Sequence, residues 1–321
     1  MKKLLILMLV AAAQIASGKT VSVQITDDLG QPVADANVSV WFWSFIAKPQ
    51  DEKKYRTDAS GRVMAEGETK VGYAITVTKE GYYTARSEPY IPPKDLIERS
   101  YVLPRVLHPT GLKAIRDTTL KLPTKDVWLG YDFEVTDWVE PYGKGKVADF
   151  RLKYKNEFSG WQLTEEKMAS ARNANSDKSE DELRFFYGKW DGELEMAFPN
   201  PQEGVYEEEK RFLPYSDLKL PHLAPESGYE PTRHYEASTY KGRLPERQVG
   251  LFFRTRVKSD AAGKIITANY AKIYGDIYFD ARGEVKFGYY YNPTPNDRNL
   301  EFDRSRNLLK LLSIQENPNY P

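Results

Sequence analysis

Hydrophobic and polar positions alternate over short stretches of the chain, and turn-forming residues separate these stretches. In the first third, apolar residues recur at every second position in 21–25, 36–42 and 73–77. Clusters rich in Gly, Asp and Ser lie between them at 27–32 and 57–61. A period of two places successive side chains on opposite faces, which is typical of half-buried β-strands. The pattern therefore predicts a small antiparallel β-sandwich.

The rest of the chain carries longer segments of the same kind. They predict strands over 127–135, 147–154, 184–198, 250–257, 265–279 and 285–291, and the last three are expected to form a meander. Asp191-Gly192 is expected to interrupt the strand over 184–198, and Gly275 to bend the one over 265–279. A short helix is predicted over 164–174 with Thr164 as its N-cap. Polar residues 173–182 and proline-rich residues 213–233 predict loops.

The first eighteen residues follow a different pattern. Two lysines at positions 2 and 3 precede an apolar run over 4–13, and small residues follow at Ala16 and Gly18. Charge orients such a segment at the translocon, apolarity inserts it, and small residues fit the peptidase. The run is too short to span a bilayer as an anchor. The sequence therefore predicts a signal peptide over 1–18, cleaved near Gly18, and a chain exported to the bacterial periplasm or cell exterior.

A cluster of prolines separates the two β-rich parts of the chain. Proline stiffens the backbone and removes a ladder donor, so the cluster predicts a connection between domains. It comprises Pro89, Pro92, Pro93, Pro104 and Pro109. The predicted domains are 19–104 and 105–321, and each is long enough for its own core. The predicted fold class is all-β throughout.

The N-terminal part resembles a bacterial Ig-like or carboxypeptidase-regulatory-like domain. The segments "VSVQITDDLGQPVADANVSVWF", "TDASGRV" and "YAITVTKEGYYTA" carry the resemblance over residues 19–104. It implies an Ig-like β-sandwich with Gly30 and Pro32 in the first hairpin turn and Asp58 with Gly61 in the second. Domains of this family serve as spacers, stalks or adhesion modules, although a fold alone does not fix a function.

The C-terminal part is similar to segments of exported bacterial proteins of uncharacterised function. The similarity lies in "YDFEVTDWVEPYGKGKVADF" and "GDIYFDARGEVKFGYYYNPTPNDRNLEFD". It implies a shared fold, expected to be a larger and mostly antiparallel β domain, and no known activity.

Composition narrows the possible chemistry. Lys and Arg number 46, equal to Asp and Glu at 46, so the chain has no general attraction to nucleic acid or anionic lipid. Cysteine is absent, which excludes disulfides, thiolate metal ligands and a thiol nucleophile. A large secreted chain without disulfides fits a bacterial exported protein. After the leader, no run of about eighteen apolar residues predicts a transmembrane helix. No cofactor is expected.

Catalytic signatures are sparse. His108, His222 and His234 have no recognised zinc spacing, so they are expected to be surface or loop residues, and no metal site is predicted. The Gly-x-Ser-x-Gly elbow of many hydrolases is missing. Glu193 and Glu195 lie on one face of a predicted strand, and paired carboxylates can serve a glycosidase. Among 46 acidic residues such pairs also arise by chance.

A second group of acidic residues surrounds the Tyr-Asp segment. It comprises Asp132, Glu134, Asp137 and Asp149. The same alternatives apply to it, a catalytic pair or a chance cluster, and no catalytic residue is assigned.

The segment 141–146 is the most distinctive candidate binding loop. Its two glycines could turn backbone N–H groups toward an anion, while Lys144 and Lys146 supply charge. Trp138 and Tyr142 flank the loop and could stack on a sugar. The simpler interpretation is a hairpin turn with solvated lysines and packed rings. Tyr290, which alternates with its tyrosine neighbours on a strand, is a further candidate for an exposed ligand platform, with a purely structural role as the alternative.

Three rings in the first domain suggest a covered face. If Val38, Val40 and Phe42 are core, then Trp41, Trp43 and Phe45 point outward as a sizeable apolar surface. The second domain or a partner chain is expected to cover them. In the alternative, the strand register is shifted by one and the three rings form the core.

Two functional hypotheses remain. The first is a non-catalytic binding or scaffold protein outside the cytoplasm, with an unknown protein as partner. The second is a carbohydrate-binding or carbohydrate-active protein, because the 22 Tyr and 6 Trp offer flat rings for sugars.

Overall fold

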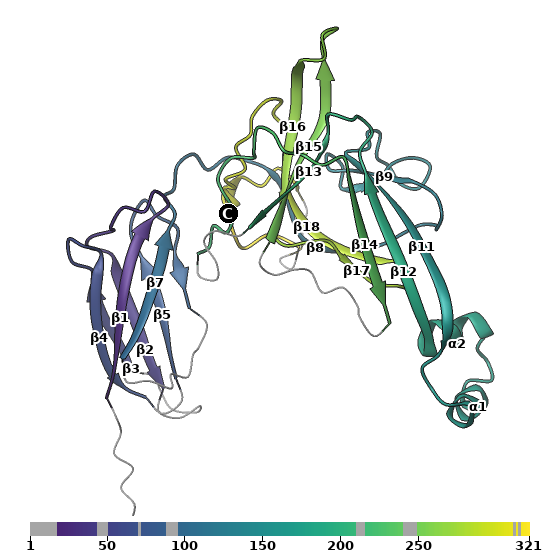
Figure 1. Cartoon of the computed structure of the whole chain (residues 1–321), viewed down its shortest axis with the longest axis horizontal. Helices are drawn as coiled ribbons and strands as arrows, with labels where there is room; N and C mark the ends of the chain where they lie inside the picture. The colour runs from purple at the N-terminus through teal and green to yellow at the C-terminus, as the bar shows by residue number, and fades with distance from the viewer. Residues whose placement is uncertain are drawn as a thin grey trace, which may run out of the picture. The chain divides into compact units, whose positions relative to one another are not determined.

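The computed structural model describes residues 18–43, 51–69, 72–87, 96–209, 216–239, 249–310, 313 and 316–321. Its contacts divide the chain into two compact units, Met1–Val106 with Pro214–Asp217, and Leu107–Leu213 with Leu218–Pro321. Both units are built of β-sheets with mostly antiparallel pairing, which confirms the predicted all-β fold (Figure 1). Residues 1–17 of the predicted leader lie outside the described residues.

The first unit contains two sheets. One has the order β4 (Arg62–Glu68), β1 (Gly18–Asp27), β7 (Leu96–Leu103), and the other has the order β3 (Asp51–Arg56), β2 (Asn37–Trp43), β5 (Gly72–Thr78), β6 (Ala85–Arg86). Strand β1 pairs antiparallel with β4 and parallel with β7. Alternate residues of both sheets form one buried cluster, so the sheets pack face to face as a sandwich.

The register of β2 follows the first of the two alternatives. Val38, Val40 and Phe42 are buried in the core, while Trp41 and Trp43 are half-buried on the opposite face. The register shift is therefore excluded. Phe45 lies outside the described residues.

The turn at 57–61 forms as expected. Asp58 accepts hydrogen bonds from the backbone N–H groups of Ser60 and Arg62. Gly61 has a φ of +75°, and a Cβ there would lie 2.4 Å from the carbonyl oxygen of Ile25. Only glycine satisfies both the left-handed backbone and this close approach.

The second unit also contains two large sheets. The first has the order β10 (Asp137–Trp138), β9 (Leu129–Asp132), β11 (Phe150–Trp161), β12 (Gly188–Ala197), β14 (Thr232–Ser238). The second has the order β13 (Gly204–Glu209), β15 (Val249–Ser259), β16 (Ile265–Ile273), β18 (Glu284–Asn292), β17 (Tyr278–Phe279), with β8 (Lys113–Lys121) paired to β18. A 3-10 turn, η1 (Arg304–Arg306), follows.

Aromatic rings from both sheets fill the space between them. The ring centroids of Phe133 and Tyr289 are 4.6 Å apart, those of Phe133 and Phe150 are 5.3 Å apart, and Phe253 lies 5.7 Å from Phe150. All four residues are fully buried. Tilted aromatic pairs at these separations stabilise the fold beyond the contribution of the apolar area that they bury. This aromatic core fixes the two sheets against each other within the unit.

The predicted meander is confirmed as β15, β16 and β18, joined by antiparallel pairing. The long strand over 265–279 is divided into β16 and β17, with Gly275 at a φ of +117° between them. Other predicted strands are shorter than expected. Strand β9 covers only Leu129–Asp132 of 127–135, because 133–136 form a turn, and β11 starts at Phe150.

The helix α1 (Glu165–Ala174) forms as predicted, with the Thr164 side chain accepting from the backbone N–H of Lys167. The prediction for the following residues was wrong. A second helix, α2 (Glu180–Tyr187), replaces the end of the predicted loop and the start of the predicted strand over 184–198. Ser179 and Glu182 form a reciprocal capping box that begins it. Strand β12 then runs through Asp191-Gly192 without the expected interruption.

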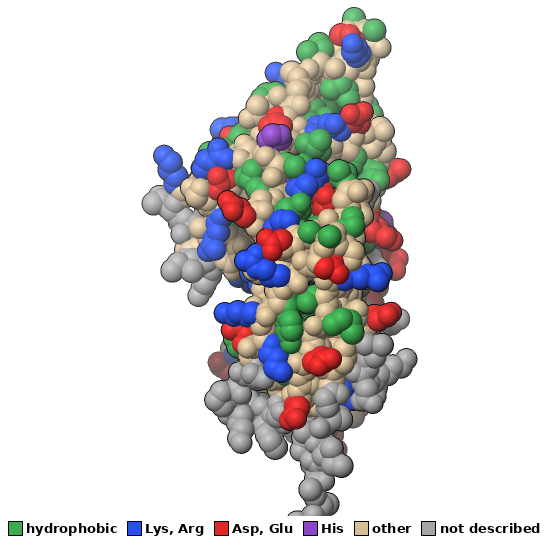
Figure 2. All heavy atoms as spheres, turned by 90° about the vertical axis from the view of Figure 1, so that its left-hand side faces the viewer, with side chains coloured by type: hydrophobic (Ala, Val, Ile, Leu, Met, Phe, Trp, Pro, Cys, Tyr) green, Lys and Arg blue, Asp and Glu red, His purple; other side chains and the backbone are tan. Residues whose placement is uncertain are grey.

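Charges of both signs are mixed with apolar side chains on the face drawn in Figure 2. This distribution fits the equal numbers of acidic and basic residues. In the described part of the chain, no helix has the length and apolarity needed to cross a membrane.

Candidate binding face

The distinctive loop over 141–146 is held by carboxylates of the protein itself. Asp137 Oδ2 accepts from the backbone N–H of Lys144 at 2.9 Å, and Asp132 Oδ2 accepts from the N–H groups of Lys146 and Val147 at 2.9 and 3.1 Å. The backbone donors that the sequence offered to an external anion thus have internal partners. The loop begins with a cis peptide bond between Glu140 and Pro141.

A half-buried arginine links this loop to the second sheet. Arg256 Nε lies 2.8 Å from Asp149 Oδ1, and its Nη2 lies 2.5 Å from Asp132 Oδ1. Burial raises the pKa of the Asp149 carboxyl, an effect that Arg256 opposes. At Asp132 burial also acts to raise the pKa, but backbone N–H donors and the charge of Arg256 outweigh it, and the pKa is lowered.

The backbone of β15 is adapted to this contact. Arg256 has a φ of 52°, and the pairing of β15 with β16 shifts register after Thr255. A bulge of this kind turns a side chain out of the regular alternation. Here it directs the guanidinium to the two carboxylates, so the acidic residues around Tyr131 form a structural network.

The remaining sequence-predicted site residues are spread over different environments. Trp138 is buried, with its ring 5.4 Å from that of Tyr131. Tyr142 is exposed, as are Lys144 and Lys146, and Lys146 forms an ion pair with Glu140. Tyr290 is buried in a separate hydrophobic cluster on the outer side of the second sheet. The structure therefore does not bring Trp138 and Tyr290 into one cluster.

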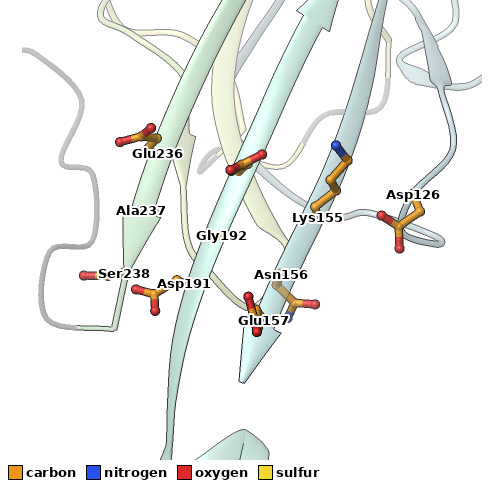
Figure 3. Close-up of a pocket in the computed structure, with 10 residues that line it drawn as sticks. Asp126, Lys155, Asn156, Glu157, Asp191, Gly192, Glu236, Ala237 and Ser238 are labelled. Atoms are coloured by element: carbon orange, nitrogen blue, oxygen red, sulfur yellow. The ribbon is translucent and has the colours of Figure 1, made fainter. Parts of the chain in front are cut away.

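A hollow of about 640 Å³ lies on the exposed face of β11, β12 and β14 (Figure 3). Its size falls within the range of small-molecule sites. We call it the sheet-face hollow. It is lined by Asp126, Lys155, Asn156, Glu157, Asp191, Gly192, Glu193, Glu236, Ala237 and Ser238.

Strand pairing explains how these residues meet. Glu193 of β12 stands opposite Lys155 of β11 and Glu236 of β14, and Asp191 stands opposite Glu157 and Ser238 in the same way. The alternation of β12 buries Leu194 and exposes Glu193 on the other face. Two rows of polar side chains thus cross three strands. Figure 3 labels Glu157, Asp191 and Ser238 of one row on three neighbouring strands.

The rows contain carboxylates facing carboxylates. Glu193 is directly opposite Glu236, and Glu157 is directly opposite Asp191. Like charges in directly opposed positions destabilise a sheet. Glu195, which continues the same face, is instead balanced by Lys153 at 3.2 Å and Lys155 at 3.6 Å. Burial acts to raise the pKa of Glu195, but these lysines outweigh it and the pKa is lowered.

An exposed indole borders this face. Trp128 directly precedes β9, and Lys153 Nζ lies 5.0 Å from the centroid of its ring. Lys153 and Lys155 share Glu195, and Lys155 lines the sheet-face hollow. A flat aromatic surface and a group of hydrogen-bond acceptors therefore lie along one sheet face.

Sequence reasoning found part of this face. It placed Glu193 and Glu195 on one side of a strand, and both are on the outer face of β12. It missed Asp126, Trp128 and Glu236. Asp126 and Trp128 precede β9 outside any strand, and Glu236 lies in β14, a strand that the sequence pattern did not predict.

The carboxylates of the face and the three histidines lie in different environments. Glu193, Glu236 and Asp191 are exposed. His234 lies next to Glu236, with Nε2 to Oε1 at 3.6 Å, and His222 lies 3.9 Å from the buried Glu301. His108 is exposed. Within the described residues, no group of three His, Asp or Glu side chains is arranged to hold a metal ion.

Comparison with known proteins gives no family. No family model and no curated protein matches the chain. A 3-chlorocatechol 1,2-dioxygenase structure from Rhodococcus opacus 1CP is 16% identical over 28% of this chain, with a TM-score of 0.23, and the chain spans 60% of it. A proposed carbohydrate binding protein from Bacteroides uniformis is 9% identical over 87% of this chain and 98% of its own, with a TM-score of 0.21. At these TM-scores the likeness supports no statement about fold or function.

Proposed function

We propose that this protein is a non-catalytic binding protein and that the exposed face of β11, β12 and β14 binds a glycan. The observation that carries the proposal is the sheet-face hollow, which Glu193, Glu236 and Asp191 line, on a face bordered by the Trp128 indole through its contact with Lys153. Sugar hydroxyls donate hydrogen bonds to carboxylates, and each carboxylate accepts at up to four positions. The C–H face of a sugar ring is apolar and packs on a flat ring such as Trp128.

The two like-charge pairs support a binding role for this face. Two neighbouring sugar hydroxyls, one donating to Glu193 and the other to Glu236, relieve the repulsion between the two carboxylates. Since the unliganded sheet is destabilised by these pairs, bound ligand and sheet stability are coupled.

We also infer that the chain is exported. This rests on the basic, apolar and small-residue order of Met1–Gly18. The resemblance of residues 19–104 to Ig-like and carboxypeptidase-regulatory-like domains supports a spacer role for the first unit. A reporter fused behind Lys19 tests export: accumulation of uncleaved product in the cytoplasm would contradict it.

Glycan-array binding of the full chain tests the proposed ligand class. Trp128→Ala and Glu193→Gln are expected to weaken binding at least about tenfold each, the loss of an aromatic contact or a charged acceptor being worth a kcal/mol or more. Tyr142→Ala is the matched control, because Tyr142 and Trp128 are exposed to 44% and 42%. Binding that survives Trp128→Ala but not Tyr142→Ala would move the site to the 141–146 loop. No glycan bound by the folded chain would contradict the proposal.

Release of reducing sugar from the bound glycans separates binding from turnover. None is expected, because the carboxylates of the face are exposed. Turnover that is abolished by Glu193→Gln or Glu236→Gln would show a hydrolase and overturn the non-catalytic assignment.

A further inference from the structure

A groove crosses the outer face of the second sheet, away from the hydrophobic core between the sheets. Its larger part, about 440 Å³, is lined by residues of β8, β18 and the β16–β17 connection, including Lys286 and Tyr278. Its smaller part, about 180 Å³, reaches Ile115 and Tyr290. Tyr274 and Gly288 line both parts, so the two are continuous.

Residues 316–321, which we call the strap, form one wall of the smaller part. The backbone N–H of Arg116 donates to the carbonyl of Glu316 at 2.7 Å. Tyr290 Oη donates to the carbonyl of Tyr320 at 3.1 Å, and the Tyr274 hydroxyl donates to the main-chain oxygen of Pro321. Main-chain oxygens of the strap thus supply most of these contacts.

Side chains of the strap contribute further contacts, among them a hydrogen bond from Asn307 Nδ2 to Asn317 Oδ1 at 3.3 Å. Pro318 is buried, and Lys219 Nζ lies 4.4 Å from the centroid of the Tyr320 ring. Glu316, Asn319 and Tyr320 are otherwise exposed. A segment held by few buried groups opens locally at low free-energy cost.

Lys272 lies beneath the end of the strap. It is on β16 and is 0% exposed, with Nζ 2.7 Å from Tyr274 Oη and 3.3 Å from the main-chain oxygen of Pro321. Its Nζ also lies 4.6 and 5.0 Å from the ring centroids of Tyr274 and Tyr290. Burial lowers the pKa of Lys272 to about 7, and the charge of Glu301 partly opposes this shift.

A fully buried lysine is costly unless its donors are used. Within the described residues, Lys272 Nζ donates to Tyr274 Oη and to the Pro321 oxygen, so the strap and the buried amine stabilise each other. The proposed glycan-binding face uses none of these residues.

We propose that the strap is exchangeable, and that the groove around Tyr274 and Tyr290 is a peptide-binding site that this chain fills with its own residues 316–321. The site recognises the main-chain oxygens through Tyr290, Tyr274 and Lys272, and it takes the same sequence when that sequence is presented in trans. Recognition through main-chain groups with one or two side-chain pockets is a common mode of peptide binding. The larger, continuous part of the groove accepts a peptide that extends past the position of Pro321.

The test uses the full chain and a fluorescein-labelled peptide of sequence Glu-Asn-Pro-Asn-Tyr-Pro. A strap variant carrying Pro318→Gly and Tyr320→Ala is expected to bind the peptide at least about tenfold more tightly than the wild type, because its own segment competes less. In the strap variant, Lys272→Met is expected to reduce peptide affinity at least about tenfold, since a donor to the last residue is lost. Equal affinities for the wild type and the strap variant would overturn the proposal.

Two further measurements guard against misfolding of the Lys272 variant. Tyr274→Phe keeps the ring and removes only the hydroxyl, so it is expected to weaken peptide binding in a normally folded chain. Lys264→Met, an exposed lysine in the turn between β15 and β16 and outside the groove, is the matched control and should bind the hexapeptide as the strap variant does. In wild-type chain, hydrogen exchange of the strap should be faster than that of β16. Strap exchange that occurs only with global unfolding would show a fixed part of the fold and contradict the proposal.

Discussion

A two-point ion pair joins the first turn of the sandwich to Arg105, the second residue after β7. Arg105 Nε and Nη2 lie 2.8 and 3.0 Å from the two carboxylate oxygens of Asp28. Burial acts to raise the pKa of Asp28, but the hydrogen bonds and charge of Arg105 outweigh it, and the pKa falls below its usual 3.8. This fork geometry is the strongest form of side-chain ion pair.

Replacing Asp28 by Asn is expected to lower the free energy of unfolding by about 1 kcal/mol at pH 7. The pKa is lowered on folding, so this contribution is present above about pH 4 and is lost as the pH falls through the folded-state value. Urea unfolding at pH 7 and near pH 2.5 measures it, and the difference between variant and wild type should shrink at the lower pH.

Asp35 provides the matched control for this prediction. It pairs with Arg56, but both side chains are more than 60% exposed. Asp35→Asn should leave urea unfolding unchanged, and its φ of 52° suits asparagine. A loss at Asp28 that persists unchanged at low pH would mean that the carboxylate charge is not its cause.

At the scale of elements, α2 depends on its first turn. Ser179 Oγ accepts from the backbone N–H of Glu182, and the Glu182 carboxylate accepts from the Ser179 N–H at 2.8 Å. Ser179→Ala is therefore expected to destabilise α2 by about 1 kcal/mol. Faster hydrogen exchange confined to 180–187 would measure this loss.

Ser176 lies exposed in the turn before α2, and Ser176→Ala should leave that exchange unchanged. If both alanine variants exchange alike, the capping box is not what holds α2. If Ser179→Ala instead accelerates exchange throughout β12, the helix and the strand unfold as one unit.

Local patterns predicted the elements that depend on local interactions. The Thr164 cap and the alternation of β15, β16 and β18 were visible because each lies within a few consecutive residues. The segment Arg184–Tyr187 was assigned to a strand because aromatic residues favour strands. Its capping box, five residues earlier, outweighed that preference. The capping pattern at Ser179 and Glu182 was present in the sequence and would have identified α2.

The candidate binding face could be predicted only in part, because its residues come from strands that are distant in sequence. Alternation placed Glu193 on the same strand face as Glu195. Glu236 lies opposite Glu193 because β12 pairs with β14, whereas β13, the next strand in the chain, belongs to the other sheet. Such pairing depends on the whole sheet. The glycine pattern at 141–146 suggested an anion site, and only the structure shows that Asp132 and Asp137 use those N–H groups.

At the scale of the whole molecule, the chain returns to its first unit late in the sequence. The N–H of Asp217 donates to the carbonyl of Thr84 at 2.9 Å, Ser216 bridges Ala85, and Asp217 pairs with Arg86. The predicted domain bounds of 19–104 and 105–321 contain no such return. Contacts between residues so far apart in the sequence leave no local signal in it.

The outward face of β2 gives the last prediction, which concerns what covers Trp41 and Trp43. Both are half-buried and lie opposite the core residues Val40 and Phe42. Burying an aromatic side chain fully contributes several kcal/mol, at about 25 cal/mol per Å² over 150–250 Å². We therefore expect residues 19–104, expressed alone, to bind a hydrophobic dye and self-associate, whereas the full chain does not.

Trp43→Ser should reduce both effects, while Met64→Ser, which removes a 55% exposed side chain from the other sheet, should not. A monomeric fragment that binds no dye would show that this face needs no cover, and the second unit or a partner would then have no such role.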